Sequence, residues 1–218
     1  MLTKEYRHVL GQYRKMRSIT RQIHTTLMNR LPLPVLQAAA RKIGLWDNGK
    51  VLLGNDTEMT VLVDYALYDC FKSGMSSVDC YVAENPPDAD TDQALAMTAM
   101  GKAYYSVLRV DESVMGAGVW VKDLLFQQEY FLADVGFSNT AMAGFILAGR
   151  MFSFEDFAMT SGAALPVSEK TFLKIVPCME EYTPGRMRKL NGPGRANLSA
   201  RIIKSCLSDG GSSSIAFL

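Results

Sequence analysis

Residues 103–162 read AYYSVLRVDESVMGAGVWVKDLLFQQEYFLADVGFSNTAMAGFILAGRMFSFEDFAMTSG, and their apolar pattern decides the fold class. Short runs within this stretch are rich in aromatic and β-branched residues, which is typical of strands. These five runs are residues 103–110, 118–125, 129–135, 144–152 and 156–162. Turn residues separate them at 111–113, Gly116, 136–140 and 155–156. Because an open sheet this small would leave its edges exposed, we predict a small antiparallel β-barrel or meander of five strands.

Before residue 103 the apolar period is that of a helix. A stripe of apolar side chains in steps of three and four runs along the first helix: Tyr6, Val9, Tyr13, Met16, Ile19, Ile23 and Leu27. A second helix is expected over residues 35–43, and Asn48-Gly49 predicts either a hairpin or a helix–helix corner. Residues 55–58 and 76–79 have the spacing of capping boxes, so each is expected to begin a helix.

The clearest linker is NPPDADTD at residues 85–92, because its two prolines exclude a helix. Asp90 or Asp92 is expected to cap the helix that follows. After the β-rich stretch, Ser168 is expected to cap a further helix that Pro177 ends or kinks, and a last amphipathic helix closes the chain.

The predicted fold class is therefore α+β, with a helical N-terminal part, the five-stranded barrel or meander, and closing C-terminal helices. Four parts are expected: a helical domain with a basic first helix (1–84), a Pro/Asp linker with a helix (85–102), the small β unit (103–167), and C-terminal helices with a flexible tail (168–218).

Charge is sorted along the chain. Residues 1–42 carry a net +8, residues 43–135 a net −10 and residues 136–218 a net +3, which together give the +1 of the whole chain. Such sorting predicts either a polyanion-binding surface or two segments that neutralise each other on folding. Tyr6 and Tyr13 lie near the first cations and are candidates for stacking on bases. The candidate nucleic-acid-binding residues lie on the first helix and in a basic loop within 183–194: Arg7, Arg14, Lys15, Arg17, Arg21, Arg186, Arg188 and Lys189.

Catalytic and metal-binding patterns are weak. His8 and His24 are the only histidines, and they are sixteen positions apart on one predicted helix, which prevents a shared metal site. Residues 136–140, GFSNT, resemble the start of a nucleophile elbow but lack its second glycine, so a plain turn is favoured. The alternating aspartates of residues 88–92 lack the glycine and glutamate of a calcium loop. The sequence therefore predicts no catalytic residue, no metal and no cofactor.

Four further charged residues are interpreted structurally. Asp64 and Asp69 are five residues apart on one predicted helix, so we expect them on different faces and not as a paired carboxylate site. Arg150 and Asp134 lie among apolar residues of the β unit. A partly buried ion pair, or polar positions on the outer face of a strand, is favoured over a ligand contact.

Nothing in the sequence indicates a membrane or a secretory route. No apolar run approaches the roughly 20 residues of a membrane-spanning helix, and the N-terminus lacks the pattern of a signal peptide. The four cysteines form no C-x-x-C pair and are interpreted as thiols in a reducing compartment. We therefore expect a cytoplasmic protein with no membrane partner.

Residues 121–167, VKDLLFQQEYFLADVGFSNTAMAGFILAGRMFSFEDFAMTSGAALPV, resemble a stretch in uncharacterised bacterial cytosolic proteins, some of which end in a SEC-C zinc-binding tail. Those proteins have an Asp-Leu-Leu turn, an Ala-Arg strand and a Gly-Ala-x-x-Pro exit. The matching residues here are 123–125, Gly149-Arg150, with glycine in place of alanine, and 162–166. A looser similarity reaches back to about Leu31. The resemblance implies a helical N-terminal part with a β-rich unit, but the cysteine-rich tail is missing, so the zinc site does not carry over.

Together these patterns favour a non-enzymatic binding or adaptor protein, whose partner is nucleic acid or a ribonucleoprotein bound by the basic first helix. The alternative is an interaction protein that self-associates through the apolar stripe of that helix, giving a homo-oligomer. A hydrolase that uses a carboxylate is a third, less favoured reading.

Overall fold

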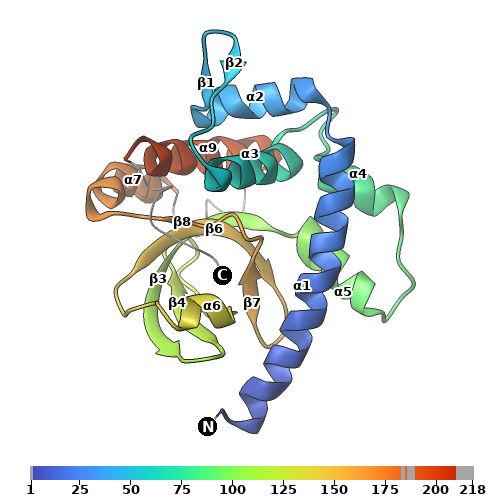
Figure 1. The fold of residues 1–218 in the computed structure, drawn as a ribbon, viewed down its shortest axis with the longest axis vertical. Helices are drawn as coiled ribbons and strands as arrows, with labels where there is room; N and C mark the ends of the chain where they lie inside the picture. The colour runs from blue at the N-terminus through green and yellow to red at the C-terminus, as the bar shows by residue number, and fades with distance from the viewer. Residues whose placement is uncertain (1, 183–184, 186–189, 210–218) are drawn as a thin grey trace.

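The computed structural model describes residues 2–182, 185 and 190–209. Strands form a closed barrel, with helices packed across one end and α1 running along one side, as Figure 1 shows. Neighbouring strands pair in the order β3-β4-β5-β7-β6, and β6 pairs back with β3. The predicted α+β fold with five strands is confirmed, and of the barrel and the meander that the sequence left open the structure has the barrel. The five strands are β3 (Tyr104–Val114), β4 (Gly118–Asp123), β5 (Glu129–Ala133), β6 (Ile146–Ser153) and β7 (Ala158–Thr160).

Closure explains why so short a sheet is stable. The pairing of β3 with β6 joins the two strands that would otherwise be edges. All pairings within the ring are antiparallel except β5 with β7, which run parallel and meet at Leu132 and Ala158. A short strand, β8 (Leu165–Pro166), adds to β6 outside the ring. Apolar side chains fill the barrel, among them Leu108, Val110, Val119, Val121, Leu132, Leu147, Met151 and Ala158.

The predicted turn at residues 111–113 is wrong, because these residues extend β3. A bulge between Val110 and Glu112 shifts the register and lets the strand continue to Val114. The chain turns instead at Gly116, whose φ of 78° lies in the left-handed region that favours glycine.

The N-terminal elements are mostly helices, and their caps follow local sequence. Asn55 and Ser76 cap their helices as predicted. The expected cap at Asp90 or Asp92 is wrong, because the side chain of Thr91 accepts the hydrogen bond from the Ala94 N–H. These elements are α1 (Lys4–Arg30), α2 (Leu33–Ile43), the hairpin β1 (Trp46–Asp47) and β2 (Lys50–Val51), α3 (Asp56–Asp69), α4 (Ser77–Glu84) and α5 (Asp92–Gly101).

The C-terminal helices pack on the end of the barrel. They are α7 (Glu169–Glu181) and α9 (Gly192–Ser208), and a single turn, α6 (Val135–Ser138), lies between β5 and β6. Ser168 caps α7 as predicted. Pro177 does not end α7, which continues to Glu181, and Gly192 belongs to the first turn of α9 instead of the predicted loop.

The apolar stripe of α1 is part of the chain's own core. Val9, Leu10, Met16, Ile23 and Leu27 are buried in a cluster with residues of α5 and aromatic residues of the barrel. The stripe that was predicted as a surface for self-association is therefore already covered within one molecule. In the part of the chain that the structure describes, no helix has the length and hydropathy needed to cross a membrane.

Candidate nucleic-acid interface

Three arginines form a line on the outward face of α1. Arg7, Arg14 and Arg21 are seven residues apart, so each lies almost directly above the last, at intervals of about 10 Å along the helix. All three are exposed, because the opposite face of α1 carries the buried apolar stripe. The helical period thus places cations at regular intervals on one surface.

Part of this line borders a groove that we call the α1 groove. Its volume is about 630 Å³. Arg17 is held in place there, because its Nη1 donates a 2.9 Å hydrogen bond to the carbonyl oxygen of Thr160 at the end of β7. Arg14 and Arg21 extend from the helix beside it. The α1 groove is lined by Tyr13, Arg14, Arg17, Ser18, Arg21, Gln22, Thr25 and Thr26.

Gly162 makes room for this arrangement. Its φ is +101°, and a Cβ at this position would lie 2.9 Å from Nη2 of Arg17. A side chain here would therefore strain the backbone and press on the guanidinium. The exit from β7 and the position of Arg17 are fitted to each other.

The other predicted residues of the first helix have different surroundings. Lys15 forms an ion pair with Asp92 of α5 at 3.4 Å. Within the described residues it is the one cation of α1 that forms a direct ion pair with the acidic middle of the chain. Arg186, Arg188 and Lys189 lie outside the described residues.

The two tyrosines predicted for stacking differ as well. The Tyr6 ring packs against Phe131, with ring centroids 5.0 Å apart, so its face is occupied by the core. Tyr13 lines the α1 groove and is half-buried. Burial and the nearby Asp134 raise the pKa of Tyr13, while Arg17 opposes them, so the phenol stays neutral. Of the two, Tyr13 alone borders the groove.

A buried cluster between α3 and the barrel places Arg150 in a buried ion pair, as favoured from the sequence, but joins it to two carboxylates that were expected to share no site. Arg150 of β6 is 2% exposed, and it contacts both aspartates of α3. Its Nε donates to Asp64 Oδ2 at 2.9 Å, and its Nη2 donates to Asp69 Oδ2 at 2.5 Å. Positions five apart on a helix are about 140° apart, but the guanidinium fork is wide enough to reach both. Asp134 is not its partner, because it caps α6 by accepting from the Phe137 N–H.

Aromatic rings enclose the guanidinium of Arg150. Its Cζ lies 4.4 Å from the ring centroid of Tyr68 and 5.7 Å from that of Tyr105. Burial alone would lower the pKa of Arg150, but Asp64 and Asp69 outweigh burial and raise it. Burial raises the pKa of Asp69, and Arg150 opposes this rise. The cluster joins α3 to the barrel and holds two carboxylates against one cation, so it is structural in the first place.

A second cavity, which we call the Asp64 pocket, opens between α1 and α3. Its volume is about 400 Å³, and it shares Arg21 and Thr25 with the α1 groove. Its wall includes His24, whose Nε2 is 2.7 Å from the hydroxyl oxygen of Tyr68. The Asp64 pocket is lined by Arg21, His24, Thr25, Met28, Met59, Thr60, Val63, Asp64, Leu67, Ser161 and Ala163.

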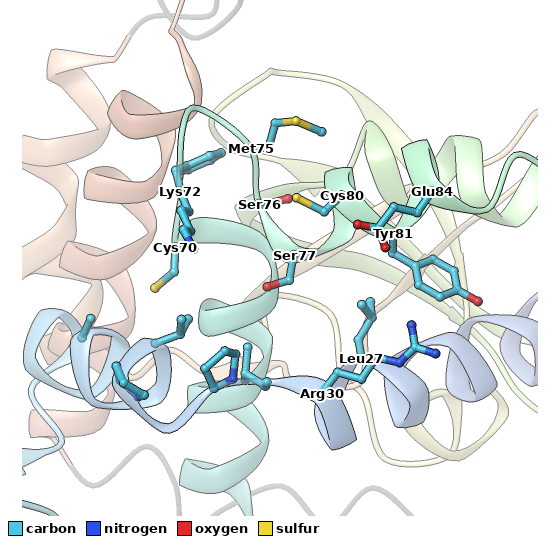
Figure 2. A pocket seen from close by; sticks show the side chains of 16 residues that line it. Leu27, Arg30, Cys70, Lys72, Met75, Ser76, Ser77, Cys80, Tyr81 and Glu84 are labelled. Carbon is cyan, nitrogen blue, oxygen red and sulfur yellow. The ribbon is translucent and has the colours of Figure 1, made fainter.

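A third cavity, shown in Figure 2, lies between α1, α2 and α4. Its volume is about 470 Å³, and two cysteines are part of its wall. Figure 2 shows the thiols of Cys70 and Cys80 on separate parts of that wall. Burial, with Asp69 adding to it, raises the pKa of Cys70 to about 11, so this thiol stays protonated near neutral pH. The arrangement does not resemble a nucleophile or a metal centre.

The GFSNT segment is a structural turn. Ser138 is buried in α6, where its hydroxyl donates to the carbonyl oxygen of Val135 and accepts from the N–H of Gly116. The first hydrogen bond lies within α6, and the second holds α6 against the β3–β4 turn. His8 and His24 are both on α1, and neither hydrogen-bonds to Ser138. The predicted plain turn at residues 136–140 is therefore a single helical turn.

No metal should copurify with the protein in stoichiometric amount. Among the residues that the structure describes, no group of three or more Cys, His, Asp or Glu side chains is placed to hold an ion. We expect elemental analysis to find less than one zinc or iron per chain and a chelator to leave the thermal midpoint unchanged. One metal per chain, lost together with several degrees of stability on chelation, would contradict this prediction.

Stability should fall between pH 7 and pH 5 because of His24. Burial, assisted by Arg17 and Arg150, lowers the pKa of His24 from its ordinary 6.5 to about 4. The unfolded chain therefore binds a proton that the folded chain does not, and the stability held above pH 6.5 is lost as the pH falls toward 4. Urea unfolding should show a loss of roughly 2 kcal/mol at pH 5.

Two substitutions separate His24 from the other groups that titrate. His24→Gln keeps a hydrogen-bonding side chain but cannot titrate, so it should flatten this pH dependence, whereas His8→Gln on the exposed face should not. If His24→Gln loses as much stability between pH 7 and pH 5 as the unmodified protein does, another group causes the pH dependence.

Comparison with known proteins identifies a family whose function is unknown. Residues 7–183 match the model of a family of unknown function, DUF7986. No curated protein and no solved structure was found to match the chain. The match agrees with the predicted resemblance to uncharacterised proteins, and it shows no link to proteins with a SEC-C tail.

Proposed function

The chain belongs to DUF7986, a family of unknown function, and we propose that it is a non-catalytic nucleic-acid-binding protein that holds a sugar–phosphate backbone along the outward face of α1. The observation that carries this proposal is the line of exposed arginines beside a groove in which Arg17 is already fixed. Exposed cations at regular intervals suit a repeating anion, since each neutralised phosphate releases a bound counterion.

Single-stranded nucleic acid fits the α1 groove best. Its cations come from one face of one helix, which follows one backbone. Positively charged grooves of this kind bind single-stranded nucleic acid without strong sequence preference, and their affinity falls steeply as the salt concentration rises. A ribonucleoprotein would present the same backbone. We further propose a cytoplasmic location, because all four cysteines are free thiols.

The test is replacement of the groove cations. Arg14→Gln/Arg17→Gln/Arg21→Gln should weaken binding to a fluorescein-labelled single strand at least tenfold, and it should reduce the slope of log affinity against log salt by about 2. Fluorescence anisotropy over a salt series measures both quantities. Circular dichroism should show an unchanged fold, because the three side chains are partly or fully exposed.

A matched variant controls for net charge. Lys42→Gln/Lys50→Gln/Lys204→Gln removes three exposed cations and should bind like the unmodified protein. These lysines belong to α2, β2 and α9, which lie at the end of the molecule opposite the N-terminus of α1 (Figure 1). Equal weakening in both variants would mean that binding follows overall charge. If the unmodified protein binds neither single strands nor duplexes at micromolar concentration and low salt, the proposed function is wrong.

A further inference from the structure

The Asp64 pocket continues the α1 groove and has the opposite charge at its floor. Arg21 and Thr25 line both cavities, so an occupant that follows the arginines passes the pocket mouth. Asp64 lines the pocket with its side chain 5% exposed. The cations of the α1 groove suit an anionic group of a ligand, whereas the carboxylate in the adjoining pocket suits a group that donates a hydrogen bond.

The carboxylate of Asp64 is only half used. Oδ2 accepts the hydrogen bond from Arg150, whereas Oδ1 is buried and has no hydrogen-bond partner among the described residues. A buried oxygen without a donor costs free energy, and a ligand that brings a donor recovers it. Because a carboxylate accepts and does not donate, the group that reaches Oδ1 carries an N–H or O–H and no negative charge.

The rest of the pocket suits a flat, largely apolar group. Val63, Leu67 and Ala163 line it, and Met28 and Met59, about half exposed, stand at its mouth. Thioether side chains are flexible and pack well against aromatic rings. Since Oδ1 itself is closed to solvent, the ring must displace side chains to reach it, and the methionines are the most adaptable of them. A volume of about 400 Å³ lies within the range of small-molecule sites.

We propose that the Asp64 pocket receives one base of the strand whose phosphates the α1 groove binds, and that the exocyclic amino group of this base donates to Asp64 Oδ1. The inference rests on the proposed function and adds a base preference to it. Phosphates stay in the groove, because the carboxylate repels them. Cytosine offers its N4 amino group to a carboxylate, whereas thymine offers O4 at the same position, an acceptor facing an acceptor.

The first experiment compares strands of equal length and equal charge. Fluorescein-labelled oligo(dC), oligo(dT) and an abasic strand are titrated with the unmodified full-length protein. We expect oligo(dC) to bind about tenfold more tightly than oligo(dT), and the abasic strand to bind through the groove alone. Equal affinity for all three strands would leave the proposed function standing and overturn the base pocket. No binding to any strand would overturn both.

Two variants assign the preference to this pocket. Met28→Ala/Met59→Ala removes the walls at the mouth and should reduce the preference to less than about twofold. Met115→Ala/Met142→Ala, at positions 76% and 74% exposed, is the matched control and should keep the preference. A preference that survives in Met28→Ala/Met59→Ala would place the base elsewhere.

Asp64→Asn gives the sharpest outcome. Because Nε of Arg150 needs an acceptor, the amide oxygen turns toward it, and the amide NH₂ takes the place of Oδ1. The pocket then offers a donor, so the preference should reverse in favour of oligo(dT). Folding of this variant is checked by circular dichroism before titration. A folded Asp64→Asn protein that still prefers oligo(dC) would show that Asp64 does not read the base.

Discussion

Arg150→Met should lower the free energy of unfolding by about 3–5 kcal/mol, because it leaves two buried carboxylates facing each other without their cation. Asp64 and Asp69 are each less than one-tenth exposed, so water does not replace the lost hydrogen bonds. For a chain of this size, that loss corresponds to a fall in the thermal midpoint on the order of 10 °C. Urea unfolding and a thermal scan at pH 7 measure both quantities.

The exposed pair of Arg109 and Asp111 supplies the control. Arg109→Met removes an arginine whose side chain is 44% exposed and should cost less than about 1 kcal/mol. Adding Asp64→Asn and Asp69→Asn to Arg150→Met should recover part of the lost stability, since the buried charges are then gone. If Arg150→Met costs no more than Arg109→Met, the cluster does not hold α3 to the barrel.

Gly118→Val should cost at least about 3 kcal/mol, at the upper end of overpacking in a well-packed core. A Cβ on Gly118 would lie 2.2 Å from the carbonyl oxygen of Leu132, 2.9 Å from Cζ of Phe131 and 3.0 Å from Cα of Ala133. Two of these atoms are backbone of the paired strand β5 and cannot move without opening the β4–β5 ladder. The measurement is the midpoint and slope of urea unfolding, followed by near-ultraviolet circular dichroism.

Gly11→Ala provides the opposite expectation. Gly11 lies within α1, and a Cβ there meets no atom within 4 Å. Alanine should therefore stabilise the helix by up to about 1 kcal/mol. If the Gly118→Val protein is as stable as the unmodified chain, β4 and β5 must leave more space at Gly118 than the structure shows.

The barrel could be predicted because each strand carries its own signal. Aromatic and β-branched runs between turn residues mark strands locally, so their number and approximate limits were predictable. The turn between β3 and β4 was harder to place from the sequence. Asp111 and Glu112 are residue types that favour turns, yet they extend β3 through a bulge. The pairing of β5 with β7 was not predictable, since no local pattern specifies a parallel contact at a single register position.

The candidate site likewise has a part that the sequence predicts and a part that it does not. The arginine line of α1 follows from the helical period alone. The Asp64 pocket combines residues near positions 24, 64 and 161, which are remote in the sequence and meet only after folding. Asp64 and Asp69 were assigned to separate faces from backbone geometry. That inference omitted the length of the arginine side chain between them.

The burial of α1 also has a consequence for synthesis on the ribosome. The helix is made before the segments that cover it, and its apolar stripe is covered by residues as late as Phe157. Between Leu27 and Phe157 the ribosome adds 130 residues, which takes roughly ten seconds at ordinary elongation rates. During that interval α5 can already cover part of the stripe, but the aromatic residues of the barrel that complete the cover are not yet all in place. The apolar stripe of α1 is therefore fully covered only after the strands of the barrel have been made, and until then part of it stays open to other apolar surfaces.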